Sequence, residues 1–140
     1  MTSLTTKLKP IAENEVLYRS VLPRLDFWES DTNEITSAVF KDPNGLSTDL
    51  SDGRFEEVCV NFLDSRQTRC GGVVSVNVTT CTEKDIYLKP DPIPNGGILP
   101  ENPFHTLVLR SCEIFVLTKS QAKHLARNAK IIRWGLVPTI

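Results

Sequence analysis

The stretch from residue 106 to residue 134 constrains the fold most, because elements follow one another there with almost no linker. Residues 106–109 and 114–117 are apolar runs, rich in branched and aromatic side chains, which indicates two buried strands. Thr118 and Gln121 have the spacing of a capping box, a motif that begins a helix. The sequence therefore predicts a helix at 119–128 between strands, with a further short strand at 131–134.

The helix predicted at 119–128 has two different sides. With about 3.6 residues per turn, one side collects apolar residues and the other collects cations. The apolar residues are Ala122, Leu125, Ala129 and Ile132. The cations are Lys119, Lys123, Arg127 and Lys130. We expect the apolar side to pack on a sheet and the row of cations to lie in water.

The rest of the chain supplies the other elements of an α+β fold. Residues 16–22 predict a first strand, 73–80 an alternating half-buried strand and 86–88 a short one. Turn residues 42–45 predict a hairpin that joins 35–40 to 46–49. An apolar stripe predicts a second principal helix at 52–65. We expect a flexible tail at 1–13 and one domain at 14–140, with a mainly antiparallel sheet of about five strands and both principal helices on one side.

Composition narrows the classes of function. The 140 residues carry a net charge of −1, so a charged partner has to be met by a local patch rather than by the whole protein. No apolar run is long enough to cross a bilayer and the first residues do not resemble a signal peptide, which predicts a cytoplasmic protein with no membrane partner. The four cysteines form no C-x-x-C pair, which argues against a zinc site and favours free thiols. We expect no metal and no cofactor.

The proline-rich segment 89–103 interrupts the regular elements. It contains five prolines and an Asn-Gly-Gly sequence, a density that excludes a helix or a central strand. Long irregular segments in small domains are often functional. The segment is predicted to be either a binding loop or a solvated crossover.

Several short motifs follow one another in a characteristic order. They are Leu17-Tyr18-Arg19 with Pro23, residues 35–40, residues 45–49, residues 73–76 before Cys81, Asp91-Pro92, residues 102–105 and a final helix rich in Lys and Ala. This order resembles a family of small bacterial proteins with Ser-x-x-Phe, Leu-Ser-Val-like and Pro-x-His segments. The resemblance implies a shared architecture and no established activity.

Four polar residues are candidates for a catalytic cleft. His105 follows a Pro-Phe pair at the entrance to a buried strand, where a histidine can act as a base or contact a phosphate. Arg19, Ser37 and Ser47 lie on predicted strands and are the candidate partners. Thr48 and Asp49 are further polar residues of the same predicted hairpin and could line the cleft. Such a set suits a small nucleotide-processing or hydrolytic enzyme, with an ADP-ribosyltransferase relative as one form. The other interpretation is that the His105 ring bonds a loop carbonyl and fixes the start of the strand.

The stronger functional hypothesis is a non-catalytic binding module. Its contact surface would be the row Lys119, Lys123, Arg127 and Lys130 or the proline-rich segment, and its partner a protein or a nucleic acid. The alternative for the row is an ordinary solvated face. The chain has no glycine-rich phosphate loop, nucleophile elbow or H-E-x-x-H sequence, which favours binding over catalysis.

Overall fold

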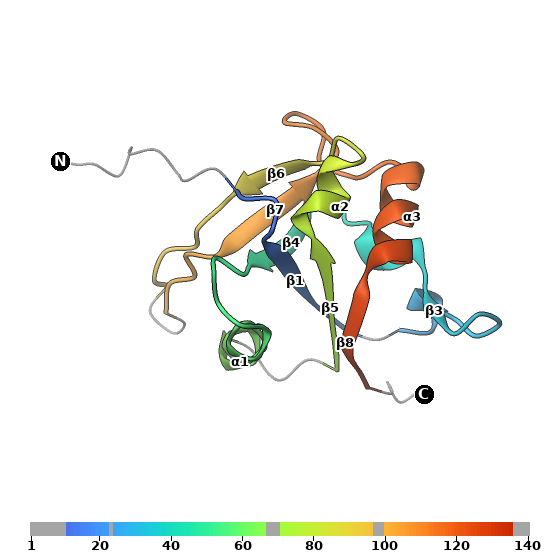
Figure 1. The fold of residues 1–140 in the computed structure, drawn as a ribbon, viewed down its shortest axis with the longest axis horizontal. Helices are drawn as coiled ribbons and strands as arrows, with labels where there is room; N and C mark the ends of the chain where they lie inside the picture. Colours follow the sequence, from blue (N-terminus) through green and yellow to red (C-terminus); the bar gives the residue numbers. More distant parts are fainter. Residues whose placement is uncertain (1–10, 23, 67–70, 97–99, 136–140) are drawn as a thin grey trace.

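A six-stranded antiparallel sheet in the order β6-β7-β4-β1-β5-β8 forms the middle of the molecule (Figure 1). The computed structural model describes residues 11–22, 24–66, 71–96 and 100–135. They form a single α+β domain, which confirms the predicted fold class with one strand more than the five or so expected. The strands are β1 Val16–Val21, β4 Leu46–Leu50, β5 Gly72–Asn77, β6 Tyr87–Pro90, β7 His105–Leu109 and β8 Lys130–Trp134.

Two principal helices and several short elements complete the fold. The principal helices are α1 Glu56–Arg66 and α3 Lys119–Asn128. The short elements are α2 Val78–Thr82, the 3-10 turns η1 Leu25–Phe27 and η2 Ser37–Phe40, and the small hairpin of β2 Trp28–Glu29 with β3 Glu34–Ile35. Thr118 and Gln121 form the predicted capping box at the start of α3, with backbone-to-side-chain hydrogen bonds of 2.9 and 3.0 Å.

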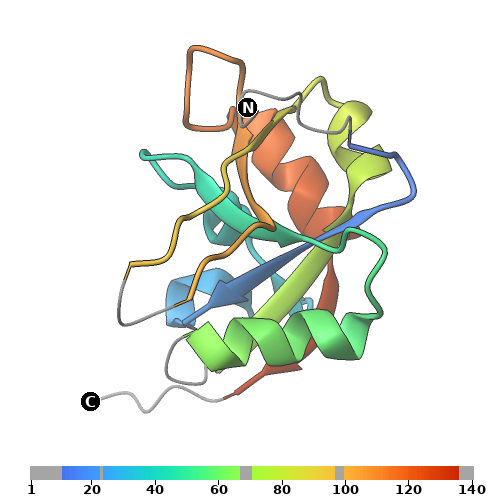
Figure 2. The same ribbon diagram turned by 90° about the vertical axis from the view of Figure 1, so that its left-hand side faces the viewer.

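The two principal helices lie on opposite faces of the sheet (Figures 1 and 2). Leu17 of β1 packs in the cluster that contains Leu125 of α3. The next residue, Tyr18, packs in a second cluster with Leu63 of α1. Successive side chains of a strand point to opposite faces. The prediction that both helices pack on one side is therefore wrong. The prediction failed because it treated β5 as apolar on one face only, the face of Val74 and Val76. Val73 makes the other face apolar too, and it packs in the second cluster with α1.

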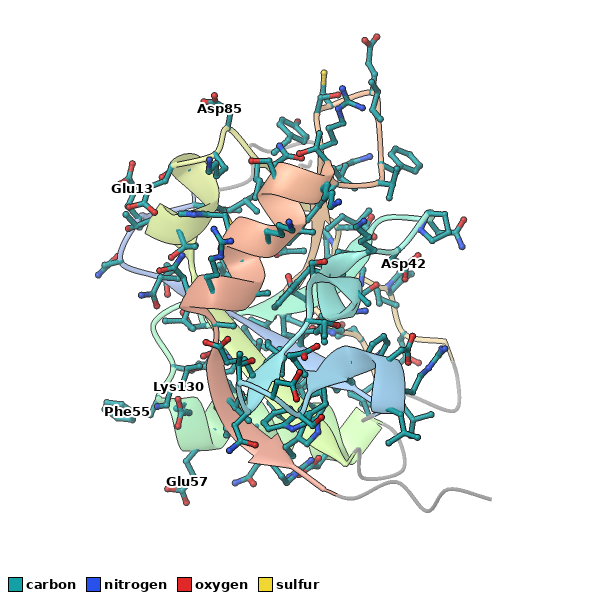
Figure 3. All side chains as sticks on the ribbon, turned by 90° about the vertical axis from the view of Figure 1, so that its right-hand side faces the viewer. Glu13, Asp42, Phe55, Glu57, Asp85 and Lys130 are labelled. Carbon is teal, nitrogen blue, oxygen red and sulfur yellow. The ribbon has the colours of Figure 1, made fainter. Side chains whose placement is uncertain are left out.

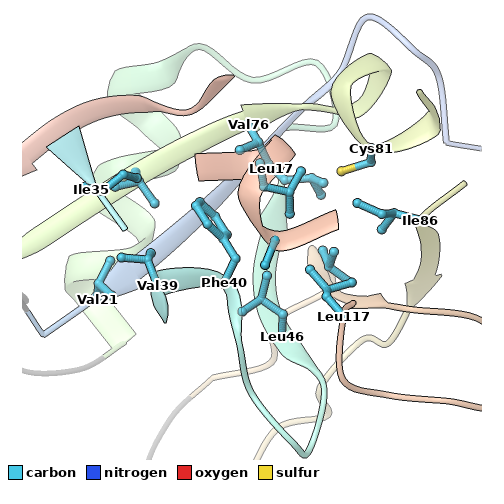
Figure 4. Close-up of a cluster of buried hydrophobic side chains, with 14 of the residues drawn as sticks. Leu17, Val21, Ile35, Val39, Phe40, Leu46, Val76, Cys81, Ile86 and Leu117 are labelled. Carbon is cyan, nitrogen blue, oxygen red and sulfur yellow. The ribbon is translucent and has the colours of Figure 1, made fainter. Parts of the chain in front are cut away.

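The larger core fills the space between the sheet, α3 and η2 (Figure 4). Each fully buried aliphatic or aromatic side chain contributes about 1.5–3 kcal/mol through the hydrophobic effect. The buried residues of the larger core are Leu17, Val21, Ile35, Val39, Phe40, Leu46, Val74, Val76, Val78, Cys81, Ile86, Val108, Leu117, Ala122 and Leu125. The apolar side of α3 is therefore buried as predicted.

Two ion pairs fix α1 to the edge strand β8. Arg133 donates two hydrogen bonds to the Asp64 carboxylate, at 2.8 and 3.1 Å. Lys130 Nζ lies 3.0 Å from Glu56 Oε1, and Figure 3 shows Lys130 near the start of α1. Lys130 therefore belongs to β8 and not to the cationic row of α3, which corrects the predicted set of four.

The predicted hairpin before β4 is wrong in its first half. Gly45 adopts φ +96°, a left-handed conformation that suits glycine, and its N–H bonds the Asp42 carbonyl at 3.1 Å, so the turn itself forms. The preceding residues 37–40 coil into η2 instead of a strand. Val39 and Phe40 are adjacent and both buried, which a helical turn allows against one core and a half-buried strand does not.

The apolar run 114–117 is not a strand. Ile114, Phe115 and Val116 are 45%, 46% and 39% exposed, and only Leu117 is buried. Ser111 stabilises a turn here, because its Oγ accepts hydrogen bonds from the backbone N–H groups of residues 113 and 114. The resulting loop 111–116 stands clear of the body of the molecule (Figures 1 and 2).

The remaining differences lie at element ends. Helix α1 begins at Glu56 rather than residue 52, because Asp52 and Gly53 take left-handed conformations in a preceding turn. The strand predicted at 73–80 ends at Asn77, where α2 follows. Residues 1–10 of the predicted tail lie outside the described residues, and Ile11 packs against the larger core.

Candidate functional site

A cavity of about 280 Å³ lies on the face of the sheet that α1 covers in part. Its residues come from β1, β4 and β7, from the last turns of α1 and from the proline-rich segment. They are Tyr18, Arg19, Ser20, Ser47, Thr48, Asp49, Leu63, Arg66, Ile93, Asn102 and His105. Ile93 and Asn102 of the proline-rich segment therefore contribute to the wall of a cavity, and they pair with each other through two backbone hydrogen bonds. Whether the segment is a binding loop or a solvated crossover stays a prediction.

The structure brings together only part of the predicted cleft. Ser47 and His105 line this cavity. Arg19 lines it too, but its guanidinium donates to the carbonyl oxygens of Val39 and Ser47, both at 3.1 Å. Ser37 is not a lining residue and lies in η2, which belongs to the α3 side of the sheet. The predicted four-residue set is therefore not assembled in one place.

His105 connects the start of β7 to the proline-rich segment. Its Nδ1 lies 3.0 Å from the Asp91 carbonyl oxygen and 3.1 Å from Asp91 Oδ2. The backbone N–H of Asp91 also donates to the His105 carbonyl at 2.8 Å. This is the geometry expected if the ring fixes the start of the strand.

The most unusual group in the cavity is Asp49, which the sequence placed among the polar residues of the predicted hairpin but not among the four catalytic candidates. Asp49 is 2% exposed, and Asn102 Nδ2 donates a hydrogen bond to Asp49 Oδ1 at 2.9 Å. Asn102 is buried as well, and its Oδ1 accepts from the backbone N–H of Phe104 at 3.0 Å. The available signal was an acidic residue inside a strand, between Thr48 and Leu50, because buried acids are rare and usually paired.

The Tyr18 hydroxyl and the Cys59 thiol on this face are not activated. Burial raises the pKa of Tyr18 to about 12, and the neighbouring Cys59 and Glu56 act in the same direction. Burial also raises the pKa of the Cys59 thiol. Both groups are therefore neutral at physiological pH, so neither supplies a nucleophile.

Arginine and aromatic side chains hold the proline-rich segment against α1. The Arg54 guanidinium carbon lies 3.4 Å from the centre of the Phe104 ring, and Phe104 meets Phe62 edge to face at 5.4 Å. Arg66 Nη1 donates to the Pro100 carbonyl. Cation–π and aromatic contacts of this kind each contribute about 0.5–1.5 kcal/mol. They fix the wall of the cavity.

A second candidate site is the basic surface of α3, a hollow of about 540 Å³ on the other side of the sheet. Its residues are Lys84, Lys119, Ser120, Lys123, His124 and Arg127. Lys119, Lys123 and Arg127 are exposed as predicted, and Lys84 joins them from the turn before β6. His124 Nε2 lies 2.9 Å from Glu83 Oε1, whereas Lys84, Lys119, Lys123 and Arg127 form no ion pair within the described residues.

Comparisons with known proteins assign no family to the chain. A scan against family models found no match, and searches of the curated proteins and of the solved structures found none either. The resemblance to small bacterial proteins stays a prediction. None of the helices that the structure describes has the length and apolar content to cross a bilayer. Among the same residues, no group of three or more His, Cys, Asp or Glu side chains is placed to bind a metal ion.

Proposed function

We propose that the protein is a non-catalytic module that binds an acidic protein partner through the basic surface of α3. The observation that carries this proposal is a hollow that, among the described residues, is lined by four cations without ion pairs and by no acidic residue. The net charge of the chain is −1, so this concentration of positive charge is local. Carboxylates of an acidic partner would form ion pairs with these four cations.

The geometry of α3 suits a partner with regularly spaced acids. Lys119, Lys123 and Arg127 follow one another by one turn, which places them about 6 Å apart along the helix. The capping box and the burial of Leu125 keep the helix in place. Carboxylates one turn apart on a partner helix would meet the three cations in sequence.

The neighbouring loop favours a protein over a nucleic acid. Ile114, Phe115 and Val116 are exposed immediately before the start of α3. Protein interfaces combine an apolar centre with a polar rim, and exposed apolar patches often mark them. A phosphate backbone would leave these side chains without a partner. Cys59, Cys81 and Cys112 are free, which supports our placing the module in the cytoplasm.

Charge reversal tests the proposal. The Lys123→Glu/Arg127→Glu double variant should bind a helical peptide with Glu one turn apart and interspersed Leu at least about tenfold more weakly, in fluorescence anisotropy. The matched control is Lys41→Glu/Lys89→Glu, which changes the net charge equally at exposed positions elsewhere. Equal loss in both doubles contradicts the assigned surface. Tighter binding of a DNA or RNA oligonucleotide than of the peptide contradicts the assigned partner.

A small hydrolytic or nucleotide-processing enzyme is the second proposal. It is supported by the shared position of Ser47 and His105 in the 280 Å³ cavity. Turnover of a nucleotide or ester panel that is lost in His105→Gln, with unchanged thermal stability, would favour it over the binding module. No turnover by the unaltered protein would reject it.

A further inference from the structure

One carboxylate oxygen in the 280 Å³ cavity has no hydrogen-bond partner. Asp49 is 2% exposed and lines the cavity, and within the described residues its Oδ2 is the single buried side-chain polar atom without a partner. Buried carboxylates are normally paired or fully hydrogen-bonded, because an isolated buried charge is costly. The site therefore offers an unmet acceptor.

Three donor side chains on this face of the sheet are directed to other acceptors. His105 is opposite Asp49 in the β4–β7 register, yet its Nδ1 is held by Asp91. Arg66 donates to the Pro100 carbonyl. Arg54 donates to the carbonyl oxygens of residues 50 and 51 and stacks on Phe104. No salt bridge to Asp49 exists in the part of the chain that the structure describes.

We propose that this cavity binds a small organic cation with a guanidinium, amidinium or primary ammonium group. One N–H of that group donates to Asp49 Oδ2, while Asn102 continues to hold Oδ1. A charged donor compensates the buried carboxylate as well as its missing hydrogen bond. The lone free oxygen does not suit a metal ion, which needs several ligands.

The shape of the cavity limits the rest of the ligand. Its volume of about 280 Å³ is at the lower end of small-molecule sites, which measure about 300–1,000 Å³. Leu63 from α1 and Ile93 from the proline-rich segment supply apolar contacts for a short aliphatic or planar body. Ser47 is exposed and Asp49 is buried, so the cation enters first and the body of the ligand follows. This site is independent of the basic surface of α3.

The test uses the full chain and ethylguanidinium as the probe. In ¹H–¹⁵N NMR titrations, ethylguanidinium should shift the amide signals of residues 47–49 and 105. Asp49→Asn puts an N–H donor in place of Oδ2 and should weaken binding at least about tenfold. The matched control Asp85→Asn alters an exposed acid in a left-handed conformation that Asn also accepts, and should bind as the unaltered protein does.

Further arms separate the outcomes. Ser47→Met fills the open side of the cavity and leaves Asp49 in place, and it should also abolish binding. This second variant keeps the proposal testable if Asp49→Asn fails to fold. Ethylurea has a similar shape and no charge, so binding equal to that of ethylguanidinium overturns the assignment of a cation. Absence of shifts in the unaltered protein, or equal shifts in Asp49→Asn, overturns the site.

Discussion

Asn102 and Asp49 are 53 residues apart in the chain and are joined side chain to side chain by a 2.9 Å hydrogen bond. Both are buried, so the bond closes the proline-rich segment onto β4 away from water. The same bond satisfies one oxygen of the Asp49 carboxylate and leaves the other without a partner among the described residues, in a side chain that lines the cavity.

Asn102→Ala should destabilise the protein because it leaves both oxygens of Asp49 without a protein partner. Loss of a hydrogen bond to a buried charged group costs about 1–3 kcal/mol or more. Urea unfolding monitored by circular dichroism measures the change in unfolding free energy. Asn14→Ala, at an exposed position, is the control and should be neutral. Equal stability of Asn102→Ala and the unaltered protein would contradict the role assigned to this bond.

Leu125→Ala should open a void between α3 and the sheet. Leu125 is fully buried, and such truncations cost about 2–5 kcal/mol. Urea unfolding monitored by circular dichroism measures this loss of unfolding free energy. Lys123→Ala, two residues away on the exposed side, should change the unfolding free energy by less than about 0.5 kcal/mol. Similar losses for both variants would mean that α3 does not pack as described.

Stability should fall as the pH rises from about 10 to about 12. Tyr18 has a pKa of about 12 in the folded protein and an ordinary value of 10.0, so the unfolded chain loses its proton first. Because the folded state binds more protons than the unfolded chain in this range, the unfolding free energy decreases as the pH rises. It stops decreasing once the pH exceeds the folded-state pKa of Tyr18. Cys81 adds to the fall from pH 9.0, because burial raises the pKa of its thiol to about 12.

The measurement is a series of unfolding midpoints from pH 8 to pH 12 for the unaltered protein and for Tyr18→Phe, which has no titrating hydroxyl. The pH range is set by these pKa values. The variant should show a shallower alkaline fall. Parallel curves for the two proteins would show that Tyr18 does not titrate differently on folding.

Alkylation should separate the free cysteines by burial. Cys112 is exposed in the loop 111–116, whereas Cys59 and Cys81 are buried and burial raises the pKa of both thiols. Iodoacetamide under native conditions should therefore modify Cys112 first. A Cys70→Ser background simplifies the mass spectra, since Cys70 lies outside the described residues. Early modification of Cys81 would contradict its position in the larger core.

Local signals in the sequence predicted the elements whose stability is local. The capping box at Thr118 and Gln121 and the apolar stripe of α3 depend on residues within a few positions, and both are present as expected. The strand at 16–22 and the strand after residue 105 were also identified from short apolar runs.

Features that depend on distant pairing were not predictable in this way. The loop 111–116 has the composition of a strand, but both long edges of β7 are already occupied by β4 and β6. The placement of α1 opposite α3 depends on how Val73 and Tyr18 face the second core cluster, which no local pattern near α1 records. The role of Asp49 likewise needs Asn102, far away in sequence.

The sheet between α1 and α3 separates the two candidate sites. An acidic partner on α3 and an organic cation beside Asp49 would compete for no atoms, so a ternary complex is sterically open. Leu46 and Asp49 lie three residues apart on β4, the first in the core beneath α3 and the second in the cavity. Strand β4 is therefore one covalent connection through which occupancy of one side can be felt on the other.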